Sequence, residues 1–288
     1  MMETIKTEAD AVSYLQEKGI IPKIKVCKNK KHYMLKKVRG RNIYWRCSHR
    51  GCMESVSVRK GTWLEGRTLP LRTVVLFLHS WVKELTSVQF CVEKLGMSHS
   101  TAVEYNCFVR EICAEDLIRN PVKIGGPGKI VEMDETVFSR LKYNHGEILP
   151  EQWVYGGVCL ETREVFLYAV PCRNRDTLEE CIQKLILPGT TIYSDMWRAY
   201  SHIPEIDGYY FEHGTVNQSI AFVKLEDGTD IQQVESTQAS IKEGIKRRRG
   251  THPSMVDSYL CEFMWRRKYE NCNLLDKLLE CIANFRFS

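Results

Sequence analysis

The sequence predicts an α/β protein in which a basic, cysteine-bearing module and a group of helices precede a domain of mixed strands and helices. Three observations predict this organisation. Residues 21–53 contain eleven Lys or Arg and no acid, residues 69–118 hold apolar segments of helical length, and β-branched and aromatic runs follow a Gly- and Pro-rich linker at 119–129. At 288 residues the chain is long enough for more than one hydrophobic core.

The composition is that of an ordinary globular protein, with 43% hydrophobic and 27% charged residues. No apolar run approaches membrane-spanning length, and the first residues, METIKTEAD, lack the apolar core of a signal peptide. The twelve cysteines are scattered through predicted helices and strands, so most are expected to be reduced and buried. These features predict an intracellular protein.

The charge is unevenly distributed along the chain. The net charge is +5, so the eleven cations of residues 21–53 leave a balance of −6 for the rest. Aromatic residues, among them Tyr33, Tyr44 and Trp45, are interleaved with these cations. Basic residues mixed with aromatics favour nucleic acid as the partner, although such a run can also be a solvated face.

The same module carries a candidate structural zinc site. Cys47 and Cys52 lie in CSHRGC, and Cys27 with His32 in CKNKKH offers a second pair, which together would supply four ligands. His49 competes with His32 as the fourth ligand, and no CxxC pair is present. A module with free thiols therefore stays open as the alternative.

The next region predicts three helices. The segment 69–84 is apolar nearly all round, 86–95 begins at an N-cap Thr86 or Ser87, and a third helix runs from a cap at Ser98 or Ser100 to about 118. The second and third, joined by a short turn with Gly96, have the spacing of a helix-turn-helix. In that case four residues near the start of the third helix would face DNA bases: His99, Ser100, Thr101 and Glu104. A purely structural hairpin stays open.

Beyond the linker the pattern becomes that of strands. Residues 129–140, 151–161 and 163–171 predict an antiparallel meander, followed by a helix that Asp176 caps and Pro188-Gly189 ends. Four elements complete the order: a fourth strand at 190–197, a short helix at 197–203, a fifth strand near 208–216 and a long helix from about 232. The order β-β-β-α-β-α-β-α predicts an RNase H-like domain with a mixed five-stranded sheet.

The predicted domains are a basic module at 1–66, a helix-turn-helix region at 67–120, a linker at 121–128, an RNase H-like domain at 129–270 and a helical tail at 271–288.

Three carboxylates fall where this fold brings chain segments together. Asp134 lies in the first strand, in VEMDETVF, Asp195 ends the fourth, and Glu235 opens the last helix. Alternation places Glu132 and Asp134 on one face of the first strand and Glu135 on the other. Three clustered carboxylates would repel one another, and a divalent cation resolves the repulsion. We therefore predict a site for two Mg²⁺ or Mn²⁺ ions that activate water for in-line phosphoryl displacement.

The chain resembles the Merlin superfamily of DDE transposases and their bacterial insertion-sequence relatives. The resemblance rests on CSHRGC, SVRKGTWLEG, VEMDETVFSRLKYNHG, TIYSDMWRAY, HGTVNQSIAFV, VESTQASIK and SYLCEFMWRRKY, which together span nearly the whole chain. It implies cleavage at terminal inverted repeats and joining of the freed 3′-hydroxyl to target DNA. It also implies that Asp134, Asp195 and Glu235 are the catalytic residues.

The chain departs from the family pattern near the predicted site. Gln218 stands where a histidine is common, Gln238 where an aromatic residue is usual, and Ile231 where a histidine often stands. Two alternatives to an active transposase follow: a domesticated, transposase-derived DNA-binding protein with weak or no catalysis, and a general nuclease on the same fold.

Further basic residues follow Glu235. Lys242 lies two helical turns beyond it and is a candidate contact to the DNA backbone. The run formed by Lys246, Arg247, Arg248 and Arg249 either binds phosphate or directs nuclear import. The expected partner is double-stranded DNA, both terminal repeats and target, held by a homodimer or larger assembly. The expected location is the nucleus, or the cytoplasm if the source is bacterial.

Overall fold

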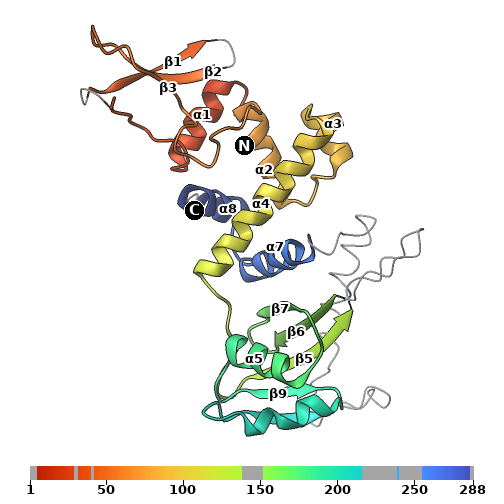
Figure 1. The fold of residues 1–288 in the computed structure, drawn as a ribbon. Coiled ribbons are helices and arrows are strands. Elements are labelled where there is room, and N and C mark those ends of the chain that lie inside the picture. The colour runs from red at the N-terminus through yellow and green to blue at the C-terminus, as the bar shows by residue number, and fades with distance from the viewer. Residues whose placement is uncertain are drawn as a thin grey trace. The chain divides into compact units, whose positions relative to one another are not determined.

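The structure is a computed structural model, and it describes residues 5–28, 32–39, 42–137, 152–215, 239 and 255–285. The chain divides into two compact units, Met1–Glu115 with Tyr269–Ser288, and Asp116–Lys268 (Figure 1). Within the described ranges, no helix is both long and apolar enough to span a bilayer.

The first unit begins with a helix and a small sheet. Helix α1 (Glu8–Glu17) starts at Thr7 in a capping box with Asp10. Strands β1 (Met34–Arg39), β2 (Asn42–Cys47) and β3 (Ser55–Ser57) form an antiparallel sheet in the order β1-β2-β3. Alternate residues of β2 are buried, so one face of this sheet packs inward and the other faces outward.

Four further helices follow the small sheet along the chain: α2 (Leu71–Val82), α3 (Val88–Leu95), α4 (His99–Arg119) and, after the second unit, α8 (Leu274–Asn284). Ser87 caps α3 by accepting a hydrogen bond from the Phe90 N–H, and α3 ends at Gly96, whose φ of 64° suits glycine. The Ser98 hydroxyl accepts from the Thr101 N–H at the start of α4. The predicted helices and the cap residues Ser87 and Ser98 are thus confirmed.

The second unit is built on a five-stranded sheet in the order β10-β9-β5-β6-β7. Its strands are β5 (Ile130–Val137), β6 (Trp153–Cys159), β7 (Val165–Val170), β9 (Thr191–Ser194) and β10 (Glu212–Thr215). Strands β5, β6 and β7 form an antiparallel meander, whereas β9 pairs in parallel with both β5 and β10. A meander extended on its first strand by two parallel strands is the RNase H-like topology, so the predicted fold is confirmed.

Helices cover both faces of this sheet. On one face, α5 (Arg175–Leu185) and the 3₁₀ helix η1 (Arg198–Glu205) pack on Val131, Met133 and Ile192. On the other face, α7 (Val256–Lys268) packs Val256 and Leu260 against Val154 and Leu167 (Figure 1). Strand β5 is therefore a central strand with a neighbour on each side, β9 and β6, and not a solvated edge strand.

Three local predictions are corrected. Asn174, not Asp176, caps α5, because the Asn174 side chain accepts a hydrogen bond from the Thr177 N–H. The helix ends at Leu185, and Ile186–Leu187 form a short strand, β8, that pairs in parallel with β4 (Ile124–Gly125). Ile186 fits the helical spacing but is fully buried in this pairing. The segment at 121–128, predicted as a linker, thus contains a strand of the second unit.

Candidate active site and cysteine cluster

The two predicted catalytic aspartates come from neighbouring parallel strands. Strands β5 and β9 pair through Ile130–Thr191, Val131–Ile192 and Glu132–Tyr193. Asp134 lies two residues beyond Glu132, and Asp195 lies two residues beyond Tyr193. Because paired strands lie about 4.8 Å apart, this register brings the two residues to the same edge of the sheet. Both are half-buried.

Backbone N–H groups hold the two carboxylates locally. Asp134 Oδ1 accepts from the Glu135 N–H at 2.8 Å, and Asp195 Oδ1 accepts from the Trp197 N–H at 2.9 Å. Both bonds involve residues one or two positions away, so each aspartate is oriented by its own segment. A carboxylate fixed in this way loses less conformational freedom when it binds a cation.

Glu135 lies on the opposite face of β5, as alternation predicted, and its side chain is only 3% exposed. Its carboxylate accepts a hydrogen bond from the Tyr200 hydroxyl and pairs with the Arg173 guanidinium. The guanidinium also lies 4.2 Å from the Trp197 ring centroid and 5.2 Å from that of Trp153. Burial raises the pKa of Glu135 above its ordinary value, and the Tyr200 hydrogen bond and the Arg173 charge offset only part of the rise.

The pKa of Tyr200 is affected by the carboxylates around the site. Burial raises its pKa well above the ordinary value, and the negative charges of Glu135, Asp134 and Asp195 raise it further. Three carboxylates therefore lie close enough to act on one phenol. Carboxylate oxygens are the donors that hard divalent cations such as Mg²⁺ or Mn²⁺ prefer, so Asp134 and Asp195 are candidate ligands.

A histidine borders the second aspartate. His213, on β10, lies 2.9 Å through Nε2 from the Ser194 hydroxyl, which itself donates to the Asp195 carbonyl at 2.9 Å. Because the hydroxyl proton is used in that bond, Nε2 is the donor to Ser194 Oγ. Burial lowers the pKa of His213, so the neutral ring is favoured. His213 thus buttresses the segment that carries Asp195.

Sequence reasoning did not single out Arg173 or Tyr200. No local pattern marks them, because Tyr200 lies 65 residues from Glu135 along the chain. Only the folded sheet brings them together. Five other predicted site residues lie outside the described residues: Glu235, Lys242, Lys246, Arg247 and Arg248.

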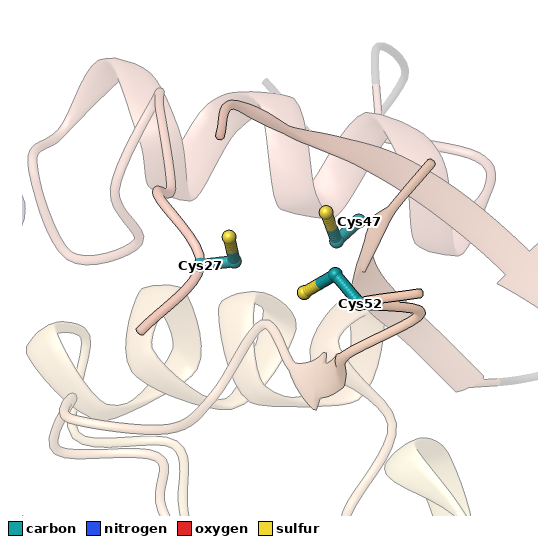
Figure 2. A group of neighbouring side chains, drawn as sticks. All are labelled: Cys27, Cys47 and Cys52. Carbon is teal, nitrogen blue, oxygen red and sulfur yellow. The ribbon is translucent and has the colours of Figure 1, made fainter. Parts of the chain in front are cut away.

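The predicted zinc ligands gather in the first unit. The sulfurs of Cys27, Cys47 and Cys52 lie within 4.8 Å of one another (Figure 2). His32 Nδ1 lies 3.9 Å from the Cys27 sulfur and 4.0 Å from that of Cys47. Three thiols at this separation could hold zinc, and His32, which lies near two of them, is a candidate for the fourth ligand of a tetrahedral site.

Two histidines stand beside the thiols, and the geometry distinguishes them. The His49 ring stacks on that of His32 with centroids 4.1 Å apart and an angle of 9° between planes. The backbone N–H of His32 donates to the Cys27 sulfur at 3.3 Å. A hydrogen bond from the His49 N–H lowers the pKa of Cys47, but burial and the neighbouring thiols outweigh it and the net pKa is raised. His32 therefore offers its ring nitrogen to the cluster, and His49 packs against His32.

The residues predicted to face DNA bases lie at the start of α4. His99 and Ser100 are exposed and Thr101 is half-exposed, whereas the following Ala102 and Tyr105 are buried. Thr101 and Ser100 are tied to the Ser98 hydroxyl at 2.8 and 3.1 Å. The first turn of α4 thus presents polar side chains to solvent, and their contact with DNA stays a prediction.

The second unit thus has an RNase H-like sheet with two aspartates beyond the paired parts of neighbouring strands. Residues 128–268 match the model of the ISXO2-like transposase domain, and this match supports a DDE transposase family.

The comparisons also found a curated relative and similar solved structures. The male abnormal protein mab-31 of Caenorhabditis elegans is 23% identical over 226 residues, which cover 70% of this chain and 52% of the relative. The chain thus spans about half the length of this relative. The HTLV-2 integrase catalytic core domain in complex with magnesium, in its dimeric form, is 18% identical with a TM-score of 0.34, over 49% of this chain and 85% of its own. The catalytic core domain of BIV integrase is 11% identical with a TM-score of 0.30, over 55% of this chain and 86% of its own.

Proposed function

We propose that the chain is a metal-dependent DNA transposase of the DDE type, which cuts DNA at terminal inverted repeats and joins the freed ends to target DNA. The observation that carries the proposal is the register of β5 and β9, which brings Asp134 and Asp195 to the same sheet edge. The match of residues 128–268 to a transposase domain supports the same class.

In this proposal Asp134 and Asp195 hold the divalent cations, and Glu235 completes the set. When bound, the cations activate a water molecule and neutralise the charge of the scissile phosphate. The backbone N–H groups of Glu135 and Trp197 keep the two aspartates oriented. Glu135 takes no part as a ligand, because Tyr200 and Arg173 occupy its carboxylate on the other face.

DNA contacts are proposed for the exposed start of α4, through His99, Ser100 and Thr101, and for the basic residues after Glu235. Zinc in the cluster of Cys27, Cys47, Cys52 and His32 would stabilise the first unit, because a cluster of this kind closes only in the folded chain. A dimer or larger assembly would hold two DNA ends at once. The curated relative is a nematode protein, which favours a nuclear location.

The test is cleavage of labelled duplexes that tile the DNA flanking the gene for this chain, with Mn²⁺, Mg²⁺ or EDTA. The full chain is expected to nick one boundary in either metal, and Asp134→Asn and Asp195→Asn are expected to lose at least 100-fold in rate, since each removes a charged ligand. Asp207→Asn, an exposed aspartate of the same unit, is the matched control and should cleave normally. Cleavage that persists in both site variants would overturn the proposal.

A second candidate is a domesticated DNA-binding protein without catalysis. It is favoured by Gln218, Ile231 and Gln238, which replace residues usual in the family the chain resembles. It predicts salt-dependent binding of the flanking duplexes with no cleavage in any metal, and equal binding by the wild type and both aspartate variants.

A further inference from the structure

The outer face of the small sheet in the first unit carries a set of uncompensated cations. The register pairs Leu35 with Arg46, Lys37 with Tyr44 and Arg39 with Asn42, and residues directly opposite one another share a face. Strand β3 adds Ser55 and Ser57 opposite Arg46 and Tyr44. This outer face therefore displays three cations, and no acid occurs in the strands that form it.

The opposite face of the same sheet points inward. Ile43, Trp45 and Cys47 are buried there, and Cys47 belongs to the cysteine cluster. Lys36 also lies on this inward side, where its Nζ donates to the Gln16 side chain of α1 at 3.2 Å. The cysteine cluster and α1 thus support the sheet from behind and leave the outer face open.

The three outer cations have no partner within the part of the chain that the structure describes. Lys37 and Arg39 are exposed, Arg46 is half-exposed, and none of them forms an ion pair or a side-chain hydrogen bond with another described residue. Three like charges on one small face repel one another, which costs stability unless an anionic partner offsets it.

The spacing of the face suits a repeating anion. Lys37 and Arg39 lie two residues apart on one strand, about 6.8 Å. Arg46 lies on the neighbouring strand opposite Leu35, so it is a diagonal neighbour of Lys37 at about 7–8 Å. Tyr44, opposite Lys37 and two residues from Arg46, adds a hydroxyl that can donate a hydrogen bond to phosphate. A pocket lined by Asn42, Ile43, Tyr44, Ser57, Val58, Arg59 and Leu71 adjoins the face. Asn42, Tyr44 and Ser57 offer it polar groups of the kind that contact phosphate.

We propose that this outer face, defined by Lys37, Arg39, Tyr44 and Arg46, binds the phosphate backbone of duplex DNA without reading its sequence. The inference rests on the proposed function, in which the chain acts on DNA, and it adds a second contact surface to the start of α4. A basic edge that only prevents strand-to-strand association is the alternative. Prevention of association requires charge on either face of the strand, whereas the proposed phosphate binding requires charge on the outer face. Variants of the two faces therefore distinguish the two roles.

The experiment measures binding of the full chain to a labelled 30-base-pair duplex by fluorescence anisotropy without added Mg²⁺ or Mn²⁺, across a range of salt concentrations. The variants are Lys37→Gln, Arg39→Gln, Arg46→Gln and Tyr44→Phe. Lys36→Gln is the matched control, because it removes the same charge from the same strand on the opposite face. Thermal unfolding and zinc content, measured for every variant, confirm that the module is intact.

Each outer-face cation removed is expected to weaken binding about fivefold at 0.1 M salt and to reduce the slope of log K against log salt by about 0.9. In the variant that combines Lys37→Gln, Arg39→Gln and Arg46→Gln, the slope should fall by about 2.7. The affinity of Lys36→Gln for DNA should stay within about twofold of that of the wild type. The loss should be the same for scrambled and flanking DNA, because backbone contacts carry no sequence information.

Equal losses for Lys36→Gln and the outer-face variants would overturn the proposal, since charge alone would then matter. Unchanged binding in the triple variant would also overturn it. Tighter binding to duplex RNA than to duplex DNA, with the same losses, would assign the face to RNA instead. These outcomes are independent of cleavage, because the reaction needs Mg²⁺ or Mn²⁺ and neither is added. The DNA-binding proposal for the outer face can therefore be overturned while the proposed transposase activity stands, and the reverse.

Discussion

The hydroxyl of Tyr200 donates a hydrogen bond to the carboxylate of Glu135, which is the direct neighbour of Asp134 on β5. Arg173 binds the other carboxylate oxygen of Glu135. Two adjacent acids on one strand thus have different surroundings, since one lies at the candidate metal site and the other joins three segments of the protein interior.

Glu135→Ala is expected to lower the free energy of unfolding by about 2–4 kcal/mol, because it leaves Arg173 and Tyr200 without their common acceptor. Glu135→Gln keeps an acceptor for Tyr200 and should cost less. Urea unfolding followed by tryptophan fluorescence measures both. Glu180→Ala, an exposed glutamate on α5, is the control and should change stability by less than about 0.5 kcal/mol. If Glu135→Ala were as stable as this control, the carboxylate would not tie the segments together.

The fourth zinc ligand can be identified by comparing two histidine variants. His32→Ala is expected to reduce the zinc content of the purified chain and to lower its melting temperature, because His32 Nδ1 lies near two of the sulfurs. His49→Ala should retain zinc, because its ring only stacks on His32. Mass spectrometry of bound metal gives the stoichiometry. Loss of zinc from His49→Ala alone would assign the ligand to His49.

The lowered pKa of His213 predicts a pH dependence of stability. The unfolded chain, with an ordinary histidine pKa of 6.5, binds more protons than the folded chain between the lowered pKa and 6.5. The His213 contribution is therefore complete above pH 6.5 and is lost as pH falls through this interval. His213→Gln should show a smaller loss of stability than wild type between pH 7 and pH 5 in urea titrations. Above pH 7.5, the difference between the two proteins should not change with pH, and a parallel pH profile throughout would contradict the assignment.

Gly157→Ala is expected to destabilise the second unit by about 1–3 kcal/mol through overpacking. Gly157 lies opposite Met133 of β5, and a Cβ there would stand 2.2 Å from Cε1 of the buried Phe166. Thermal unfolding measures the loss. The double variant Gly157→Ala with Phe166→Leu should couple favourably, because the smaller side chain makes room for the methyl group. Strictly additive losses would show that the methyl group does not meet Phe166.

The strand order and the Asp134–Asp195 register could be predicted from sequence because both depend on patterns that alternate along a strand and on the limited set of sheet topologies. The cap of α5 was mispredicted because Asn174 and Asp176 are both good capping residues two positions apart, and only the hydrogen bond to Thr177 distinguishes them. The catalytic roles of the acids stay predictions.

The environment of Glu135 could not be predicted for a different reason. Charge on a strand usually indicates solvent exposure, and the two groups that stabilise this buried carboxylate come from segments distant in sequence. Similarly, the spacing of the cysteines and histidines allowed either His32 or His49 beside the thiols. The folded position of each ring was needed to separate them.

Helix α8 belongs with residues 1–115 although it is made after the whole of the second unit. Its Asp276 pairs with Lys18 at 2.5 Å, and it packs on α2. On the ribosome, the first unit must therefore wait with part of its apolar surface uncovered while residues 116–268 are synthesised. The second unit, although later in sequence, can complete its fold before the first. Ending the chain at residue 268 would consequently uncover the surface of α1 and α2 against which α8 lies, although these helices are more than 180 residues earlier in the sequence.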